Sequence, residues 1–92
     1  MAFPKWSPKD PDEVLDYNID WSARLTSPDT ITTSEWIVPD GLTVENEGLE
    51  AATATIWLSS GVLGEKYELL NRVVTTEGRT MDQTVTLQIK TK

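Results

Sequence analysis

The last third of the chain constrains the fold most, because it contains two runs of β-prone residues with a polar turn between them. Both runs lie within residues 64–90, are rich in β-branched and aromatic side chains, and flank a turn centred on Gly78. This pattern is typical of two antiparallel strands joined by a short connection. We therefore expect an all-β chain.

The earlier part of the chain contains further strand patterns. From Leu15 to Trp21 apolar and polar residues alternate, which places four apolar side chains on one face of a half-buried strand. Residues 30–38, 42–49 and 52–58 predict three more strands, separated by turn-forming residues. About six strands at a spacing of about ten residues, with no 3.6-residue apolar period, indicate a β-sandwich.

Tyr67 narrows the prediction of the fold. It follows Leu63-Gly64-Glu65-Lys66 and begins a run in which Leu69 and Val73 alternate with polar residues. Immunoglobulin-like sandwiches often have a tyrosine at the start of the penultimate strand, bonded back to upstream backbone. We expect an immunoglobulin-like or fibronectin type III-like antiparallel β-sandwich of about six to seven strands.

The chain of 92 residues is the size of one domain. Prolines at positions 4, 8 and 11 exclude a helix or a central strand near the N-terminus. We expect residues 1–12 to form an extended arm and residues 13–92 to form a single sandwich domain. The aromatic residues Phe3 and Trp6 either fold back onto the sandwich, which we favour, or bind in a partner.

The net charge of −7 is concentrated in the first half of the chain. Residues 1–50 contain eleven acidic and three basic residues, a net −8, whereas residues 51–92 contain four and five, a net +1. An acidic surface argues against binding nucleic acid or an anionic membrane. It indicates either simple solubility or docking to a basic partner.

Membrane insertion and export are not expected. No apolar run approaches the roughly 20 residues that a membrane helix needs. The N-terminus also lacks the apolar stretch of a signal peptide. We expect a soluble protein made in the cytoplasm.

The sequence offers few groups for catalysis, because it contains no cysteine and no histidine. Serine and threonine hydroxyls therefore lack a histidine base, and glycine-rich phosphate loops are absent. The acids from Asp10 to Asp16 lack the ligand ladder of a calcium loop. We expect no enzymatic activity, no metal and no cofactor.

Four tryptophans leave a carbohydrate-binding module as an alternative, because exposed tryptophans often stack on sugars. Trp21 shares its strand face with apolar residues, and Trp36 and Trp57 adjoin aliphatic residues, so we predict that these three pack in the core. Only Trp6 is then a candidate for an exposed platform.

The order of several short motifs resembles a known family. These motifs are Lys9 to Tyr17, Ile19 to Leu25, Trp36-Ile37-Val38-Pro39, Asn71-Arg72 and Gly78 to Thr84. Together they resemble small phage and prophage proteins known as fiber-tail adaptors. The resemblance implies a virion structural protein, made in the bacterial host cytoplasm, that connects the tail or neck to the fibre. It implies phage tail, neck or fibre proteins as partners, is compatible with a homo-oligomer in the particle, and brings no catalytic residues.

Candidate contact residues lie in the arm and at the entrance to the first strand. We predict that a partner contacts Trp6, Asp10, Asp12, Glu13 and Asp16. The alternative is that the acids from Asp10 to Asp16 are only a solvated strand entrance. Residues 81–90 are the candidate for an exposed sheet edge that could receive a partner.

Overall fold

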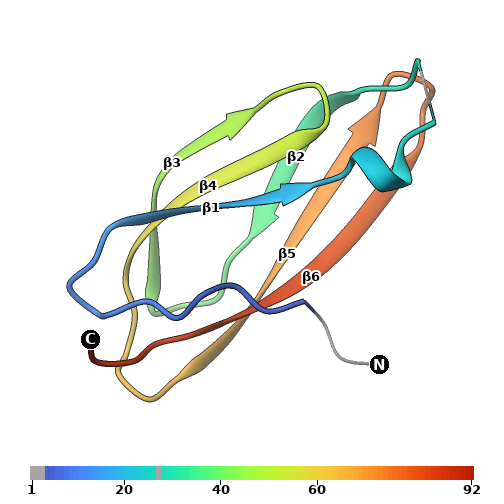
Figure 1. Cartoon of the computed structure of the whole chain (residues 1–92). Coiled ribbons are helices and arrows are strands. Elements are labelled where there is room, and N and C mark those ends of the chain that lie inside the picture. Colours follow the sequence, from blue (N-terminus) through green and yellow to red (C-terminus); the bar gives the residue numbers. More distant parts are fainter. Residues whose placement is uncertain (1–3, 27) are drawn as a thin grey trace.

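The computed structural model describes residues 4–26 and 28–92, and it is built from β-strands (Figure 1). The elements are β1 (Leu15–Asp20), the 3-10 turn η1 (Ser22–Arg24), β2 (Ile31–Ile37), β3 (Leu42–Leu49), β4 (Thr53–Ser60), β5 (Lys66–Thr75) and β6 (Thr80–Gln88). All the strands expected from the sequence are present, and the all-β class is confirmed. In the part of the chain described, no helix is long and apolar enough to cross a membrane.

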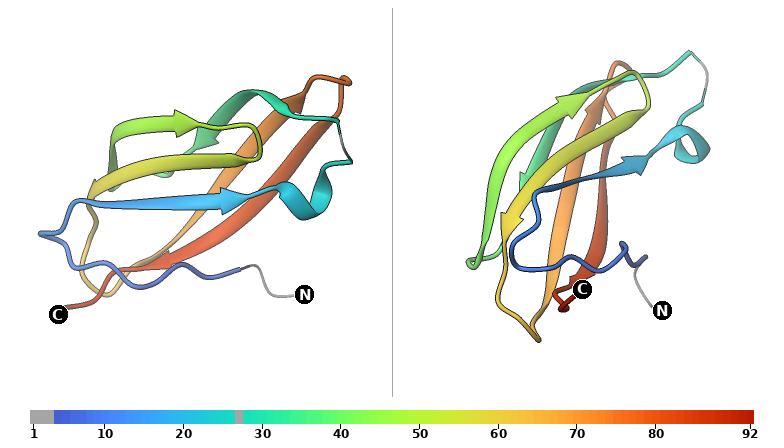
Figure 2. Two further views of the ribbon diagram at one scale, coloured as in Figure 1. Left: turned by 45° about the horizontal axis from the view of Figure 1, so that its top comes forward. Right: turned by 60° about the vertical axis from the view of Figure 1, so that its left-hand side comes forward.

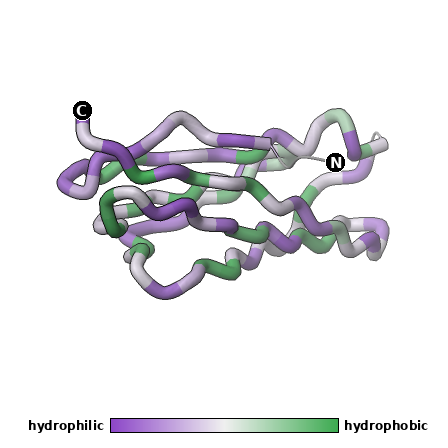
Figure 3. Tube along the Cα trace, turned by 90° about the horizontal axis from the view of Figure 1, so that it is seen from below, coloured by the Kyte–Doolittle hydropathy of each residue, from purple (hydrophilic) through white to green (hydrophobic). Residues whose placement is uncertain are grey.

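The strands form two antiparallel three-stranded sheets that face each other (Figure 2). One sheet has the order β1–β4–β3 and the other the order β2–β5–β6. Hydrophobic and hydrophilic residues interleave along the strands (Figure 3). In β5, for example, Leu69 and Val73 are fully buried while Glu68 and Arg72 are exposed. This two-residue period places one face of each sheet in a shared core.

The core contains a larger and a smaller cluster of buried side chains. The larger cluster joins residues from both sheets, namely Tyr17, Ile56, Leu58, Tyr67, Leu69, Val85, Leu87 and Ile89. The smaller cluster contains Trp21, Ile31, Ala54 and Val73. Because fully burying one such aliphatic side chain contributes about 1.5–3 kcal/mol, these clusters supply most of the driving force for folding.

A buried hydrogen-bond network links the two sheets at Asn71. The Trp21 indole Nε1 donates to Asn71 Oδ1 at 2.9 Å. The Asn71 amide nitrogen donates to Ser34 Oγ at 2.9 Å and to the carbonyl oxygen of Glu35 at 3.0 Å. Since the Asn71 side chain is fully buried, these bonds satisfy polar groups that would otherwise be costly to bury.

Tyr67 begins β5 and fixes the connection that precedes it. Its hydroxyl oxygen accepts a hydrogen bond from the backbone N–H of Val62 at 3.0 Å. The ring also lies against Gly41, where an added Cβ would come within 2.6 Å of the hydroxyl. Gly41 has a φ of +106°, so glycine is required there for both conformation and space.

The N-terminal segment runs beside β6 (Figure 1). Its backbone pairs in parallel with β6, with Trp6 N donating to Thr86 O at 2.9 Å and Thr86 N donating to Pro4 O at 3.0 Å. Further along, Lys9 N donates to Gln88 O at 3.0 Å and Lys90 N donates to Lys9 O at 2.8 Å. Prolines fit this segment because the bonds that it donates come from Trp6 and Lys9.

The expected open edge over residues 81–90 is therefore wrong for its second half, because the N-terminal segment covers it. Among the strands described, β2 and β3 are the outer strands on the opposite side of the sandwich. Each of these strands has an irregular register, between Ile31 and Thr33 in β2 and between Val44 and Asn46 in β3. Such irregularities reduce the tendency of an outer strand to pair with another chain.

Candidate docking surfaces

Trp6 packs between β1 and β6 at the edge of the sandwich. Its ring stacks on Tyr17 with a centroid distance of 4.7 Å and lies 5.8 Å from the Trp36 ring. The Trp6 indole Nε1 also donates to the backbone oxygen of Asn18 at 3.2 Å. The expectation that Trp6 folds back onto the sandwich is confirmed, while Phe3 lies outside the described residues.

Asp10 and Glu13 hold the end of the N-terminal segment against the C-terminal residues. Glu13 Oε1 accepts a hydrogen bond from Asp10 N at 2.8 Å and forms an ion pair with Lys92 Nζ at 2.9 Å. The Asp10 carboxylate accepts hydrogen bonds from the backbone N–H groups of Asp12, at 2.9 Å, and Lys92, at 3.0 Å. These backbone hydrogen bonds lower the pKa values of both carboxyl groups.

Asp12 and Asp16 are more available to a partner than Asp10 and Glu13. Both of their side chains are exposed, whereas those of Asp10 and Glu13 are partly buried. Asp16 lies on β1, where it pairs with Trp57 of β4, and it lines the same surface hollow as Trp6. Lys92, which bonds to Asp10 and Glu13, lines that hollow too, and the contact of the five residues with a partner stays a prediction.

Lys9 is buried, and no pattern in the sequence predicts a buried lysine at this position. It is fully buried, and its ammonium group donates hydrogen bonds to Ser60 O and, at 2.8 Å, to Asp10 O. Burial lowers the pKa of Lys9, while the nearby carboxylates of Glu13, Asp10 and Asp12 oppose that shift. Lys9 therefore joins the N-terminal segment to the end of β4.

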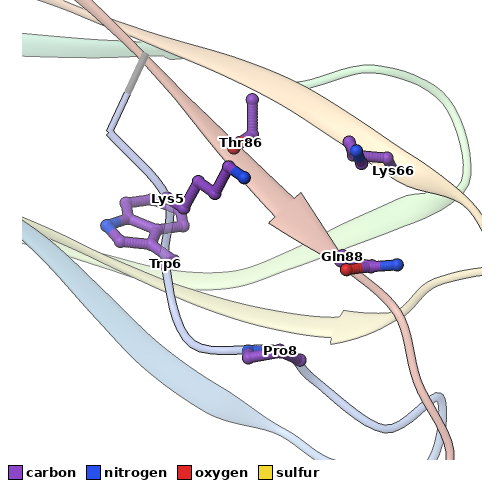
Figure 4. A pocket seen from close by; sticks show the side chains of 6 residues that line it. All are labelled: Lys5, Trp6, Pro8, Lys66, Thr86 and Gln88. Atoms are coloured by element: carbon purple, nitrogen blue, oxygen red, sulfur yellow. The ribbon is translucent and has the colours of Figure 1, made fainter. Parts of the chain in front are cut away.

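A small basic pocket lies on the outer side of the seam between the N-terminal segment and β6 (Figure 4). It has a volume of about 150 Å³ and is lined by Lys5, Trp6, Pro8, Lys66, Thr86 and Gln88. Lys5 and Lys66 lie on either side of β6 and take part in none of the ion pairs among the described residues. The pocket could therefore receive a carboxylate of a partner.

The outer face of the other sheet contains Trp57, which was expected to be in the core. Trp57 is 40% exposed, so that expectation is wrong. The reason is the two-residue period of β4, in which Ala54, Ile56 and Leu58 are fully buried and the residue between the last two points outward. The predictions for Trp21, which is 1% exposed, and for Trp36, which packs against the larger core cluster, are confirmed.

The buried carboxylate of Asp29 forms hydrogen bonds that hold two parts of the chain together. Asp29 is buried and accepts hydrogen bonds from Thr76 Oγ1 at 2.7 Å, Glu77 N at 3.1 Å and Arg79 at 2.9 Å. These bonds connect the chain before β2 to the β5–β6 turn. Within residues 4–26 and 28–92, no three His, Cys, Asp or Glu side chains gather in a way that could hold a metal ion.

The comparison with protein families identifies the class of protein. The sequence pattern of the family described as podophage GP4 fiber-tail adaptor protein gp77 matches residues 9–88. The chain belongs to this family. The match confirms the resemblance noted in the sequence, and it gives the chain the structural role of a phage fiber-tail adaptor, which implies contacts with tail and fibre proteins. No curated protein matches the chain.

The matched residues of the adaptor include both sheets and begin at Lys9, after Trp6. Sequence reasoning missed Lys5, Lys66 and Trp57 as surface features of this adaptor. The absence of lysine and arginine from residues 25–65, which include β3 and β4, could have indicated that this sheet is acidic, but it does not indicate that Trp57 is exposed.

Proposed function

We propose that this chain is a non-enzymatic virion protein that connects the phage tail, or its neck, to the fibre through protein–protein contacts. The family match across both sheets carries the proposal. The absence of histidine and cysteine from the sequence and the structural use of Asp29 support the non-enzymatic part. Synthesis in the bacterial host cytoplasm is part of the same proposal.

We further propose that the sandwich is immunoglobulin-like. In that fold, strands B, E and D lie in one sheet and strands C, F and G in the other. The orders β1–β4–β3 and β2–β5–β6 correspond to these two sets. The Tyr67 hydroxyl, bonded to the backbone of Val62 before β5, corresponds to the tyrosine corner of such domains.

A connector needs two separate surfaces, and this chain has two with different chemistry. The basic pocket at Lys5 and Lys66 lies on the seam with β6, whereas Trp57 lies on the outer face of the opposite sheet. Repetition of the chain in a particle, as a homo-oligomer or around a symmetric tail, would make individually weak contacts effective. These features support an adaptor that joins two different proteins.

Deletion of the gene in the phage or prophage that encodes this chain tests the proposal. We expect particles that have tails but lack fibres when they are imaged by negative-stain electron microscopy. Expression of the chain from a plasmid should restore the fibres, which controls for effects on neighbouring genes. Particles that carry fibres at normal occupancy after the deletion would contradict the connector function.

A small carbohydrate-binding module is the second candidate. The exposure of Trp57 among polar side chains favours it, because aromatic platforms on sheet faces can stack on sugars. Titration with a broad panel of glycans should then quench tryptophan fluorescence in the native chain but not in Trp57→Ala. A flat response across the panel would eliminate this candidate.

A further inference from the structure

Trp57 occupies the centre of the outer face of the β1–β4–β3 sheet. It lies in the middle of the central strand, and its register partners are Asp16 on β1 and Asn46 on β3. Residues directly opposite one another in antiparallel strands point to the same face. We name this surface the Trp57 face and define it by Asp16, Asn18, Asn46, Thr55, Trp57 and Ser59.

The side chains around Trp57 on this face are polar. Thr55 and Ser59 flank it along β4, and Asn18 lies opposite Thr55. Trp57 is thus a large apolar side chain on a polar surface, with 40% of its area exposed. Tryptophan in such a position is enriched among the residues that dominate binding energy at protein interfaces.

The charge on this sheet has one sign. Strands β1, β3 and β4 contain Asp16, Asp20, Glu45 and Glu47 and no lysine or arginine. Glu45 accepts a hydrogen bond from Ser59 Oγ at 2.6 Å, so its carboxylate reaches the Trp57 face. None of the three ion pairs among the described residues involves this sheet. The carboxylates therefore attract cationic groups from outside the chain.

We infer that the Trp57 face is a docking surface for an arginine-bearing, basic surface of a protein partner. The inference rests on the proposed connector function and names one of its two binding surfaces. A partner arginine would stack its guanidinium plane on the Trp57 ring and donate hydrogen bonds to the Asp16 carboxylate. Charge complementarity selects this occupant over an acidic or a purely apolar surface.

Arginine fits this face better than lysine because its flat, delocalised cation both stacks on aromatic rings and forks onto carboxylates. The chain itself contains one example of an arginine on a tryptophan ring and one of an arginine bonded twice to a carboxylate. The Arg24 guanidinium lies 4.8 Å from the Trp21 ring centroid. Arg72 donates two hydrogen bonds to the Asp82 carboxylate, at 2.9 and 3.1 Å.

The size of the Trp57 face implies weak binding by a single copy. Three strands of about eight residues, spaced about 4.8 Å apart with a rise of about 3.3 Å, present an area on the order of 400 Å². A standard interface buries about 800 Å² per partner. A single contact should therefore be weak and gain strength by repetition, so the test must detect weak binding.

Nuclear magnetic resonance of the ¹⁵N-labelled full chain provides such a test. The probe is an acetylated and amidated Arg-Gly-Arg-Gly-Arg peptide, compared with the same peptide containing lysine or uncharged citrulline in place of arginine. We expect saturable shifts of the Trp57 indole signal and of the Asp16 and Asn46 amides with the arginine peptide. Binding should weaken by at least about fivefold with lysine and be lost with citrulline.

Matched variants separate binding from folding. Trp57→Ala and Asp16→Asn should each weaken binding of the arginine peptide while the rest of the amide spectrum is preserved. Ile37→Ala is the control, because Ile37 is an exposed apolar residue on the other sheet and should leave the affinity unchanged. Unchanged affinity in Trp57→Ala, shifts centred elsewhere, or saturable shifts of Trp57 by a sugar instead of the peptide would overturn the inference.

An experiment with phage particles distinguishes failure of this inference from failure of the proposed function. Particles carrying the double variant Trp57→Ala, Asp16→Asn should lose fibres as particles without the gene do. If gene deletion removes the fibres but the double variant retains them, the connector function holds and the Trp57 face is not its docking surface. If deletion leaves the fibres in place, the connector function fails, whereas the peptide titration still reports on the Trp57 face.

Discussion

At the scale of single residues, Asn71 is the most sensitive position in the core. Replacing it with alanine removes three hydrogen bonds and leaves the buried Trp21 indole N–H and the Glu35 carbonyl without their partner. We expect Asn71→Ala to lower the free energy of unfolding by about 2–4 kcal/mol. Urea denaturation followed by tryptophan fluorescence measures this change. The control is Asn18→Ala at an exposed position, and an equal effect of both variants would contradict this role of Asn71.

Trp21 and Trp57 show when the burial of a single side chain can be predicted from the sequence and when it cannot. Trp21 was placed correctly because it continues a strict alternation that begins at Leu15. Trp57 was not, because in Ile56-Trp57-Leu58 three consecutive apolar residues give no period from which to assign a face. The pairing of β4 between β1 and β3 decides which of them point outward, and that pairing is not local to the run.

At the scale of elements, the N-terminal segment stabilises the sandwich that it borders. It contributes the stacked Trp6 ring, the buried Lys9 ammonium and backbone hydrogen bonds to β6. Since each net hydrogen bond contributes about 1 kcal/mol and ordering the segment opposes this, we expect removal of residues 1–12 to cost about 2–4 kcal/mol. The truncated chain should also self-associate, because β6 becomes an open edge.

Urea denaturation and analytical ultracentrifugation measure these two effects. Lys5→Ala is the control, since Lys5 is an exposed residue of the same segment and should change neither quantity. A truncated chain that stays monomeric with an unchanged urea midpoint would mean that the segment is a separable arm. The strands themselves could be predicted because each is a local run of β-prone residues bounded by turn-forming residues. The parallel pairing of the N-terminal segment with β6 could not, because it joins residues about 80 positions apart and leaves no local pattern.

At the scale of the whole molecule, the depressed pKa values of several carboxyl groups predict how stability depends on pH. Burial alone would raise the pKa of Asp29, but hydrogen bonds from Thr76 and Glu77 and the charge of Arg79 hold it below its ordinary 3.8. Arg72 lowers the pKa of Asp82, and backbone hydrogen bonds lower that of Asp10. A carboxyl group with a lower pKa in the folded state contributes stability above its unfolded pKa and loses it as the pH falls.

We therefore expect the urea midpoint to be nearly constant from pH 7 to pH 5 and to fall once the pH drops below the ordinary aspartate value of 3.8. The net charge of −7 acts in the opposite direction, because self-repulsion decreases towards the isoelectric point near 4.3. Asp29→Asn separates the two effects, since it removes one depressed carboxyl group and barely changes the net charge. The variant should be less stable at pH 7 and should lose less stability than the native chain between pH 5 and pH 2. If both proteins show the same loss over that range, the buried Asp29 carboxylate does not contribute to the acid sensitivity of the fold, which then comes from the other carboxyl groups with lowered pKa values, such as Asp10 and Asp82, and from repulsion among the basic groups.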